Sequence, residues 1–323
     1  MQKVKFGTAI IACSVLTLGT SALAQDVKVL GGGLKGGAYA MAVGLSKLLR
    51  DKAGMNAQPQ TSGGMVAQAR LLNKGSAEFA FGIGGPIGAW AYNGEGRFKT
   101  EGAKDKLRGV MAYPFGNLQW VTLADSPVKS IADLKGKTIS VGKASSTTQT
   151  FGKIFIEAHG IKMSELKATT PGFGGGFNQL RNGNVAAHLT LGKTPISALR
   201  EMATTKSFRL VHMDPAVIKK IADDIGSGVT VDSVAPDAYG DAQKNTTPAT
   251  TLGLFFGFST STNTSADLVY KVTKTLFENL DDYKKATTKA KAVTLEAACE
   301  GLAFPLHEGA RRYYQEIGHK GCS

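Results

Sequence analysis

The sequence Val27-Lys28-Val29-Leu30-Gly31-Gly32-Gly33-Leu34-Lys35-Gly36-Gly37-Ala38-Tyr39 predicts a short buried strand, a glycine-rich turn and the first residues of a helix. The helix is expected to run from about Tyr39 to Ala53. Glycines allow backbone angles with positive φ and let a ligand approach the main chain closely. The free N–H groups at a helix start, together with the helix dipole, favour an anion in such a turn.

The turn has two other interpretations. It is also compatible with a tight structural turn that holds no ligand, since glycine-rich turns between strands and helices are common. Gly31, Gly33 and Gly36 match the glycine spacing of a dinucleotide-binding fold, which further requires an acidic residue at the end of a second strand. Asp51 lies instead in the last turn of the predicted helix, so dinucleotide binding is disfavoured.

Residues 1–24 have the features of a secretory signal peptide. Lys3 and Lys5 precede an apolar run that is too short to span a bilayer, and Ala22-Leu23-Ala24 is typical of a cleavage site. We therefore expect export to the periplasm and cleavage after Ala24. The two cysteines that remain, Cys299 and Cys322, are candidates for a disulfide bond in an oxidising compartment, with two free thiols as the alternative.

The formal net charge of +13 is spread along the chain, and many basic residues stand beside acidic ones. No basic run is interleaved with aromatic residues, so nucleic-acid binding is not supported. A positive surface is expected to speed encounters with anions, without identifying one.

Alternating strand and helix signals predict α/β architecture. Strands are expected at 55–61 and 78–83, each followed by a helix, and two more at 107–113 and 118–123. The same rhythm resumes from Ser130 to Val211, which predicts a second α/β domain. The remainder is expected to hold an apolar strand from Leu252 to Phe258 and then helices at 266–279, 281–291, 294–300 and 308–317.

Three loops follow predicted strands and open helices: residues 36–39, 61–64 and 145–148. In open α/β sheets, ligands sit at the carboxyl ends of the strands, so these loops would face one another across a cleft between the domains. Small hydroxyl groups and helix N–H groups suit a carboxylate. Each loop taken alone is also explained by ordinary helix capping, because Ser and Thr are good caps. Tyr39, Phe115 and Phe173 lie in loops where a ring could cover a ligand, whereas Trp90 and Trp120 are expected in the core.

Catalysis and metal binding have weaker signals. No Gly-x-Ser-x-Gly elbow is present, and Ser145 and Ser146 have no neighbouring His or Asp in the sequence. The five histidines show no ligand spacing, so no metal and no cofactor are expected. An exported α/β hydrolase centred on Ser145 remains the alternative from another functional class.

Several motifs together resemble the TAXI family, the TRAP-associated extracytoplasmic immunogenic proteins. They are residues 36–39, 61–64, 130–137, 276–280 (Leu-Phe-Glu-Asn-Leu) and 305–314 (Pro-Leu-His-Glu-Gly-Ala-Arg-Arg-Tyr-Tyr), in that order. The last two are the most specific, and the resemblance covers the whole mature chain.

The resemblance implies a type II periplasmic-binding-protein fold, in which two α/β lobes are joined by a hinge around a ligand cleft. One lobe would hold residues 25–115 and 229–323, and the other residues 116–228. Tyr113, Pro114 and Phe115 would form one hinge crossing, and residues near 226–231 the other. The expected ligand-binding residues are Gly37, Tyr39, Thr61, Ser62, Gly63, Gly85, Ser145, Ser146, Thr147, Phe173 and Thr194.

The same resemblance implies a function in transport without catalysis. A monomeric protein would bind a small organic acid (a dicarboxylate, 2-oxoacid or acidic amino acid) and deliver it to TRAP membrane subunits, expected to be fused. A periplasmic sensor that binds the same ligand is a further alternative. This chain departs from the family pattern at Ala40, at Ala186-Ala187 and in the glycine-rich loop 173–176, so its pocket is expected to differ in shape.

Overall fold

The computed structural model describes residues 26–34, 36–144 and 146–322, with the backbone but not the side chain of Phe173. The predicted signal peptide and Ser145 therefore lie outside the described residues. Within the described part, no helix is both long and apolar enough to cross a bilayer.

In the described part of the chain, ten strands form a single mixed sheet. Their order is β2-β1-β3-β10-β4-β7-β5-β6, with β8 beside β4 and β9 beside β10. The strands are β1 (Asp26–Leu30), β2 (Asn56–Gln60), β3 (Phe79–Phe81), β4 (Leu107–Leu123), β5 (Thr138–Ser140), β6 (Lys167–Thr169), β7 (Ala187–Gly192), β8 (Phe208–Leu210), β9 (Val229–Val234) and β10 (Ala249–Ser261).

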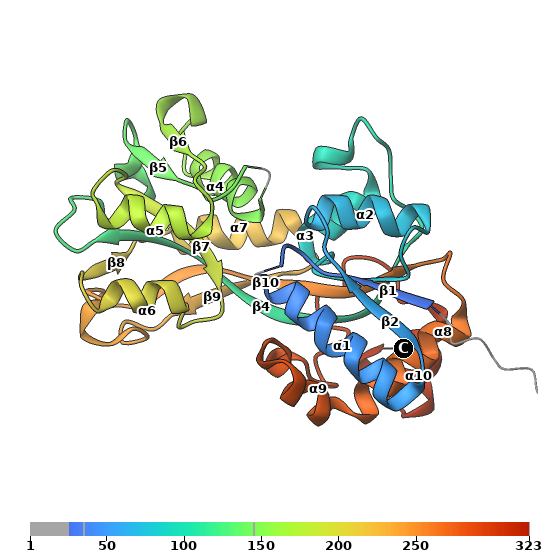
Figure 1. Ribbon diagram of the computed structural model, residues 1–323. Helices are drawn as coiled ribbons and strands as arrows, with labels where there is room; N and C mark the ends of the chain where they lie inside the picture. The colour runs from blue at the N-terminus through green and yellow to red at the C-terminus, as the bar shows by residue number, and fades with distance from the viewer. Residues whose placement is uncertain (1–25, 35, 145, 323) are drawn as a thin grey trace, which may run out of the picture.

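Helices cover both faces of the sheet (Figure 1). The α-helices are α1 (Gly37–Ala53), α2 (Met65–Lys74), α3 (Gly85–Asn93), α4 (Thr147–Ala158), α5 (Phe173–Arg181), α6 (Ser197–Ala203), α7 (Pro215–Ile225), α8 (Ala266–Glu278), α9 (Leu280–Ala286) and α10 (Glu308–Glu316). Short 3-10 helices are η1 (Gly96–Phe98), η2 (Ile131–Leu134), η3 (Met163–Glu165), η4 (Gly240–Ala242), η5 (Thr288–Ala292) and η6 (Lys320–Cys322).

The elements gather into two lobes (Figure 1). Lobe I contains β1–β3 with α1–α3 and α8–α10, and lobe II contains β5–β8 with α4–α6. Parallel pairing of β1 with β2 and β3, and of β5 with β6 and β7, directs the carboxyl ends of each set to one edge. The long antiparallel strands β4 and β10 run between the lobes.

Buried aromatic rings hold the centre of lobe I together. The ring of Phe258 on β10 stacks on Phe81, with centroids 4.4 Å apart, and on Phe79, at 5.2 Å. All three side chains are fully buried. Burying an aromatic side chain of this kind contributes about 1.5–3 kcal/mol, so β3 is held in the sheet although it has only three residues.

The prediction of two strands at 107–113 and 118–123 was wrong, because β4 is continuous across the proline that separates them. Its pairing with β10 changes register between Leu254 and Phe255, opposite Pro114. A proline, which has no N–H group to donate, is tolerated at such an irregularity. Gly116 has a φ of +150°, and a Cβ there would lie 2.2 Å from the Gly192 carbonyl carbon. Tyr113, Pro114 and Phe115 thus lie in the irregular part of this strand.

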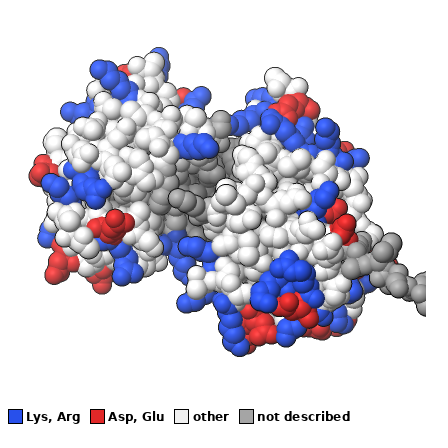
Figure 2. All heavy atoms as spheres, viewed as in Figure 1, with Lys and Arg blue, Asp and Glu red and all other residues white. Residues whose placement is uncertain are grey.

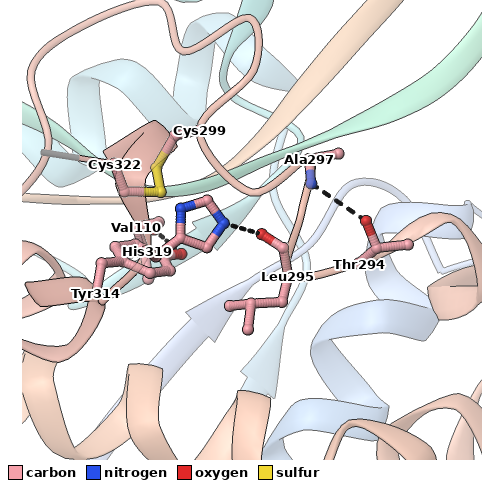
Figure 3. The surroundings of a disulfide bond; sticks show 8 residues. All are labelled: Val110, Thr294, Leu295, Ala297, Cys299, Tyr314, His319 and Cys322. Carbon is pink, nitrogen blue, oxygen red and sulfur yellow. Dashed lines mark hydrogen bonds between the residues drawn. A yellow bond between two sulfur atoms is a disulfide. The ribbon is translucent and has the colours of Figure 1, made fainter. Parts of the chain in front are cut away.

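The predicted helix at 294–300 is also absent; the segment forms turns instead. It runs beside β4, where the N–H of Ala112 donates to the carbonyl of Ala298 at 2.6 Å. Cys299 is joined to Cys322 by a disulfide bond (Figure 3). Pairing with β4 therefore overrides the local helix preference of this segment.

Candidate functional site

A cleft lies between the lobes and is visible as the hollow in Figure 2. Its largest part is a cavity of about 800 Å³ lined from both lobes. Lobe I contributes Gly33, the start of α2, Ile87 and Arg97, and lobe II contributes residues 143–144, 146–147 and Thr150. A cavity of about 270 Å³ adjoins it through Met65, Lys143, Ser146 and Thr147, which line both.

Two further cavities extend the cleft. One of about 670 Å³ lies between the starts of α1 and α6, and shares Phe115 and Leu191 with the 270 Å³ cavity. The other, of about 690 Å³, is mainly apolar and is lined by Trp90 and Ile154 among others. It joins the 800 Å³ cavity through Val66, Ile87, Arg97 and Thr150.

Helix starts point toward this cleft because α1, α2 and α4 each follow a strand that ends at it. The residues before α1 and α2 are Gly36 and Gly64, and neither helix has a side-chain cap. The first N–H groups of an α-helix have no partner within the helix, and the dipole makes this end positive. Two uncapped helix starts in lobe I therefore offer hydrogen-bond donors to an anion.

Capping of α2 by Thr61 or Ser62, the alternative explanation of the loop 61–64, is not what the structure shows. Gly64, with a φ of +91°, precedes the helix, and the Ser62 hydroxyl donates instead to the carbonyl of Gly31. The Gln68 amide nitrogen donates to the same carbonyl at 3.0 Å. Ser62 therefore holds the glycine-rich turn in place. Gly31 is required there, because a Cβ would lie 2.4 Å from the Tyr39 Cα.

Ser146 does cap its helix. Its hydroxyl accepts a hydrogen bond from the N–H of Gln149 at 3.2 Å and lies 2.9 Å from the hydroxyl oxygen of Thr148. The two loops thus use serine differently, as a helix cap in lobe II and as a clamp on the neighbouring turn in lobe I.

The structure brings some of the expected ligand-binding residues together. Ser62, Gly63, Ser146 and Thr147 line the 800 Å³ cavity, and Gly37 and Thr194 line the 670 Å³ cavity. Tyr39, Thr61 and Gly85 line neither of them, nor the other two cavities described above. Ser145 and the Phe173 side chain lie outside the described part of the chain.

Gly85 and Thr194 have structural contacts of their own. Gly85 has a φ of +50°, and a Cβ would lie 2.3 Å from the carbonyl oxygen of Phe255, so the start of α3 packs directly on β10. The Thr194 hydroxyl donates to the Asn117 amide oxygen at 3.1 Å and accepts from the Gln119 amide nitrogen at 2.8 Å. Asn117 in turn donates to Asp232 at 2.9 Å, which links β4 to β9.

The charged side chains of three of the four cavities have one sign. Every charged side chain that lines the 800, 270 and 670 Å³ cavities, among the described residues, is Lys or Arg. They are Arg70, Arg97, Lys143, Lys193, Arg200, Lys289 and Lys291. Arg70 is paired with Glu101, whereas the side chains of Arg97 and Lys143 make no ion pair within the described chain. Figure 2 shows Lys and Arg side chains on both rims of the hollow.

Sequence reasoning missed several residues that line the cleft. Phe256 and the half-buried Met65 were not among the expected residues. With Phe115, which was expected to be able to cover a ligand and whose ring stacks on Phe256 at 3.9 Å, they give the 270 Å³ cavity an apolar wall. His188 lines the same cavity and is fully buried. Burial lowers the pKa of His188 to about 4, so the imidazole is neutral at neutral pH. Its position within a buried strand gave no sequence signal for a ligand contact. No cluster of His, Cys, Asp and Glu suited to a metal occurs among the described residues.

The architecture and cleft define a mixed α/β fold of the type II periplasmic-binding-protein class, as predicted. PhnD1 from Prochlorococcus marinus, in complex with methylphosphonate, matches with a TM-score of 0.57 and 10% identity, over 92% of this chain and 98% of that one. A Xanthomonas citri protein bound to ATP matches with a TM-score of 0.52 and 13% identity, over 93% and 97%. The periplasmic aliphatic sulphonate binding protein SsuA from Escherichia coli matches with a TM-score of 0.47 and 13% identity, over 90% and 83%.

The sequence itself places the protein in a family. The NMT1-like family model matches residues 29–318, nearly the whole chain, and the protein therefore belongs to the NMT1-like family.

Proposed function

We propose that this protein is an exported solute-binding protein that captures a small organic anion in the interlobe cleft and delivers it to a membrane transporter. On the TAXI resemblance, the transporter is of the TRAP type with fused membrane subunits, and the ligand is a dicarboxylate, a 2-oxoacid or an acidic amino acid. The protein acts as a monomer in the periplasm after cleavage at Ala24, without catalysis.

One observation carries the anion assignment. Cationic side chains line the cavities at the centre of the cleft, and the uncapped starts of α1 and α2 face the same space. Positive charge in a cleft with low-dielectric walls concentrates anions and speeds their capture. Helix N–H groups then bind a carboxylate or another oxyanion without a dedicated arginine. In keeping with this, the similar structure of PhnD1 is a complex with methylphosphonate and that of the Xanthomonas citri protein is bound to ATP, and both ligands are anions.

Capture involves closure of the two lobes on the ligand. The division into residues 25–115 and 229–323 against 116–228 is part of this proposal, with Tyr113, Pro114 and Phe115 as one hinge. The register change in β4 and the loop before β9 provide places where the backbone can bend. A ligand that contacts both lobes favours the closed form by its higher affinity for that form.

A serine hydrolase is less well supported by the contacts in the cleft. The Ser146 hydroxyl is engaged with Thr148 and the N–H of Gln149, and His188 has its Nδ1 3.0 Å from the Ser140 hydroxyl. No described His nitrogen is within hydrogen-bonding distance of Ser146 Oγ, as a general base would be. Periplasmic sensing remains a second use of the same binding site.

The test is a thermal-shift screen of the mature protein, unfolded and refolded beforehand to remove any co-purified ligand. Succinate, 2-oxoglutarate and L-glutamate are the first probes, and succinamide is the uncharged control. A ligand at one hundred times its Kd stabilises the folded state by about 2.7 kcal/mol, so the Tm should rise with a charged acid and not with succinamide. An equal rise with succinamide would contradict anion recognition, and no rise with any acid in a wide panel would contradict the binding function.

A further inference from the structure

Strand β7 carries two buried polar side chains that lack partners. The Nε2 atom of His188 and the hydroxyl of Thr190 make no hydrogen bond within the described chain, and both residues are fully buried. Alternate residues of a strand point to the same face, so both groups lie on the face of β7 that α5 covers at His188. Buried polar groups are nearly always paired, and an unpaired one needs an explanation.

The imidazole is held in place by its surroundings. Its Nδ1 lies 3.0 Å from the hydroxyl of Ser140 on β5, directly opposite in the strand register. The Phe177 ring meets it edge-on, with centroids 4.7 Å apart. At Gly176 a Cβ would lie only 2.2 Å from the His188 Cε1, so α5 can cover the ring only because residue 176 is glycine.

His188 also lines the 270 Å³ cavity at the centre of the cleft. The same cavity is lined by Ser146, Thr147 and Thr148 at the start of α4, and by the stacked rings of Phe115 and Phe256. An acid whose carboxylate binds at the start of α4 would therefore place its remaining polar group near the histidine. A buried water on Nε2 is the simpler alternative, and such waters are common in proteins.

We propose that His188, with Thr190 beside it, is a ligand-binding residue whose Nε2 forms a hydrogen bond with a second polar group of the captured acid. This inference rests on the proposed function, since it concerns the same cleft. It assigns a binding partner to the second polar group of the proposed ligands, an oxo, amino or second carboxylate group that a plain monocarboxylate such as butyrate lacks.

The experiment compares His188→Phe with the matched control His319→Phe. His319 is also an imidazole with one nitrogen bonded, Nε2 to the Leu295 carbonyl at 2.8 Å, and the other buried without a partner (Figure 3). It lies in the C-terminal tail beside the disulfide bond. Both changes replace a ring by an apolar ring of similar size. Binding of succinate, 2-oxoglutarate, L-glutamate and butyrate is measured by calorimetry for both variants and the unmodified protein.

We expect at least a tenfold rise in Kd for the polar acids in His188→Phe and less than a twofold change in His319→Phe. An acid that binds the unmodified protein and keeps its Kd within twofold in His188→Phe overturns the inference and leaves the proposed function standing. That is also the result expected if a water occupies Nε2. If none of the acids binds the unmodified protein, the proposed function and the inference fail together.

A second measurement covers the case in which His188→Phe does not fold. In protein labelled with ¹⁵N-histidine, the His188 Nε2 resonance should shift when a bound acid reaches saturation, while that of His319 stays in place. Saturation confirmed by calorimetry with an unchanged His188 resonance overturns the inference.

Discussion

The cleft and the C-terminal tail of this protein differ in the ion pairs that their charged side chains make. The tail, residues 308–322, is held against α8 by two ion pairs: Glu316 lies 2.7 Å from Lys274, and Arg312 lies 2.8 Å from Asp267. A disulfide bond joins its last turn, at Cys322, to Cys299. Around the cleft, the side chains of Arg97 and Lys143 make no ion pair within the described chain, although both line its central cavities. Because both regions belong to one folded chain, the difference indicates that the tail is built for stability and the cleft for an external partner.

Removal of the disulfide bond should have the largest effect, because it should lower the stability of the tail without changing ligand binding in the cleft. Cys299 and Cys322 are separated by 23 residues, and closing a loop of that size lowers the entropy of the unfolded chain by an amount equivalent to about 3 kcal/mol. We expect the double change Cys299→Ser and Cys322→Ser to lower the free energy of unfolding by about this much, measured by denaturant titration. Ligand affinity should be unchanged, and a large loss of affinity in the folded variant would contradict the separation of the two regions.

An effect of similar size is expected from acid titration of the cleft. Burial lowers the pKa of His188 to about 4 from an ordinary value of 6.5, so the unfolded chain takes up a proton at higher pH than the folded protein. The contribution of His188 to the free energy of unfolding is therefore fully present above about pH 6.5. It is lost as the pH drops toward 4, and the loss is about 3 kcal/mol in total.

The His188→Phe variant isolates this effect from that of His307, whose pKa burial also lowers. Between pH 6.5 and 4, its free energy of unfolding should change with pH less steeply than that of the unmodified protein. Parallel pH profiles for the two proteins would show that His188 is not the group responsible.

The smallest effect is expected from a single cation at the rim of the cleft. Lys143→Ala should weaken binding of an acid by about threefold to tenfold, mainly through a slower association rate, and high salt should reduce the difference. The matched control is Lys219→Ala, since Lys219 is an exposed lysine that pairs with Asp223 on α7 at 2.8 Å. An equal effect of both changes would mean that the net charge of the protein matters, and not the position of Lys143.

Much of the fold could be predicted from the sequence because its signals are local. The strand before Gly31, the helix that follows it and the helices at 266–278 and 308–316 were predicted close to their observed bounds. Each combines a run of apolar residues at a regular period with a recognisable start or end. The tight Gly31 turn follows from the same signals, since glycine allows the backbone of the helix to approach.

The roles of individual polar groups could not be predicted, because their partners are distant in sequence. Helix capping by Ser or Thr was one explanation of the loop 61–64, yet the Ser62 hydroxyl donates to the carbonyl of Gly31, a residue 31 positions away. The segment 294–300 consists largely of residue types that favour a helix, yet the carbonyl of Ala298 accepts a hydrogen bond from β4 instead. In both places a long-range hydrogen bond replaces the local one.

The sequence by itself determined the α/β units, the glycine turns at the strand ends and a pair of cysteines available for a disulfide bond, since these depend on neighbouring residues. Only the tertiary structure decided which polar groups stay free for a ligand. His188 is turned toward Ser140, 48 residues away, by strand pairing, and α5 covers its ring at Gly176. Its unpaired nitrogen results from contacts among three separate elements, and no local pattern in the sequence encodes them.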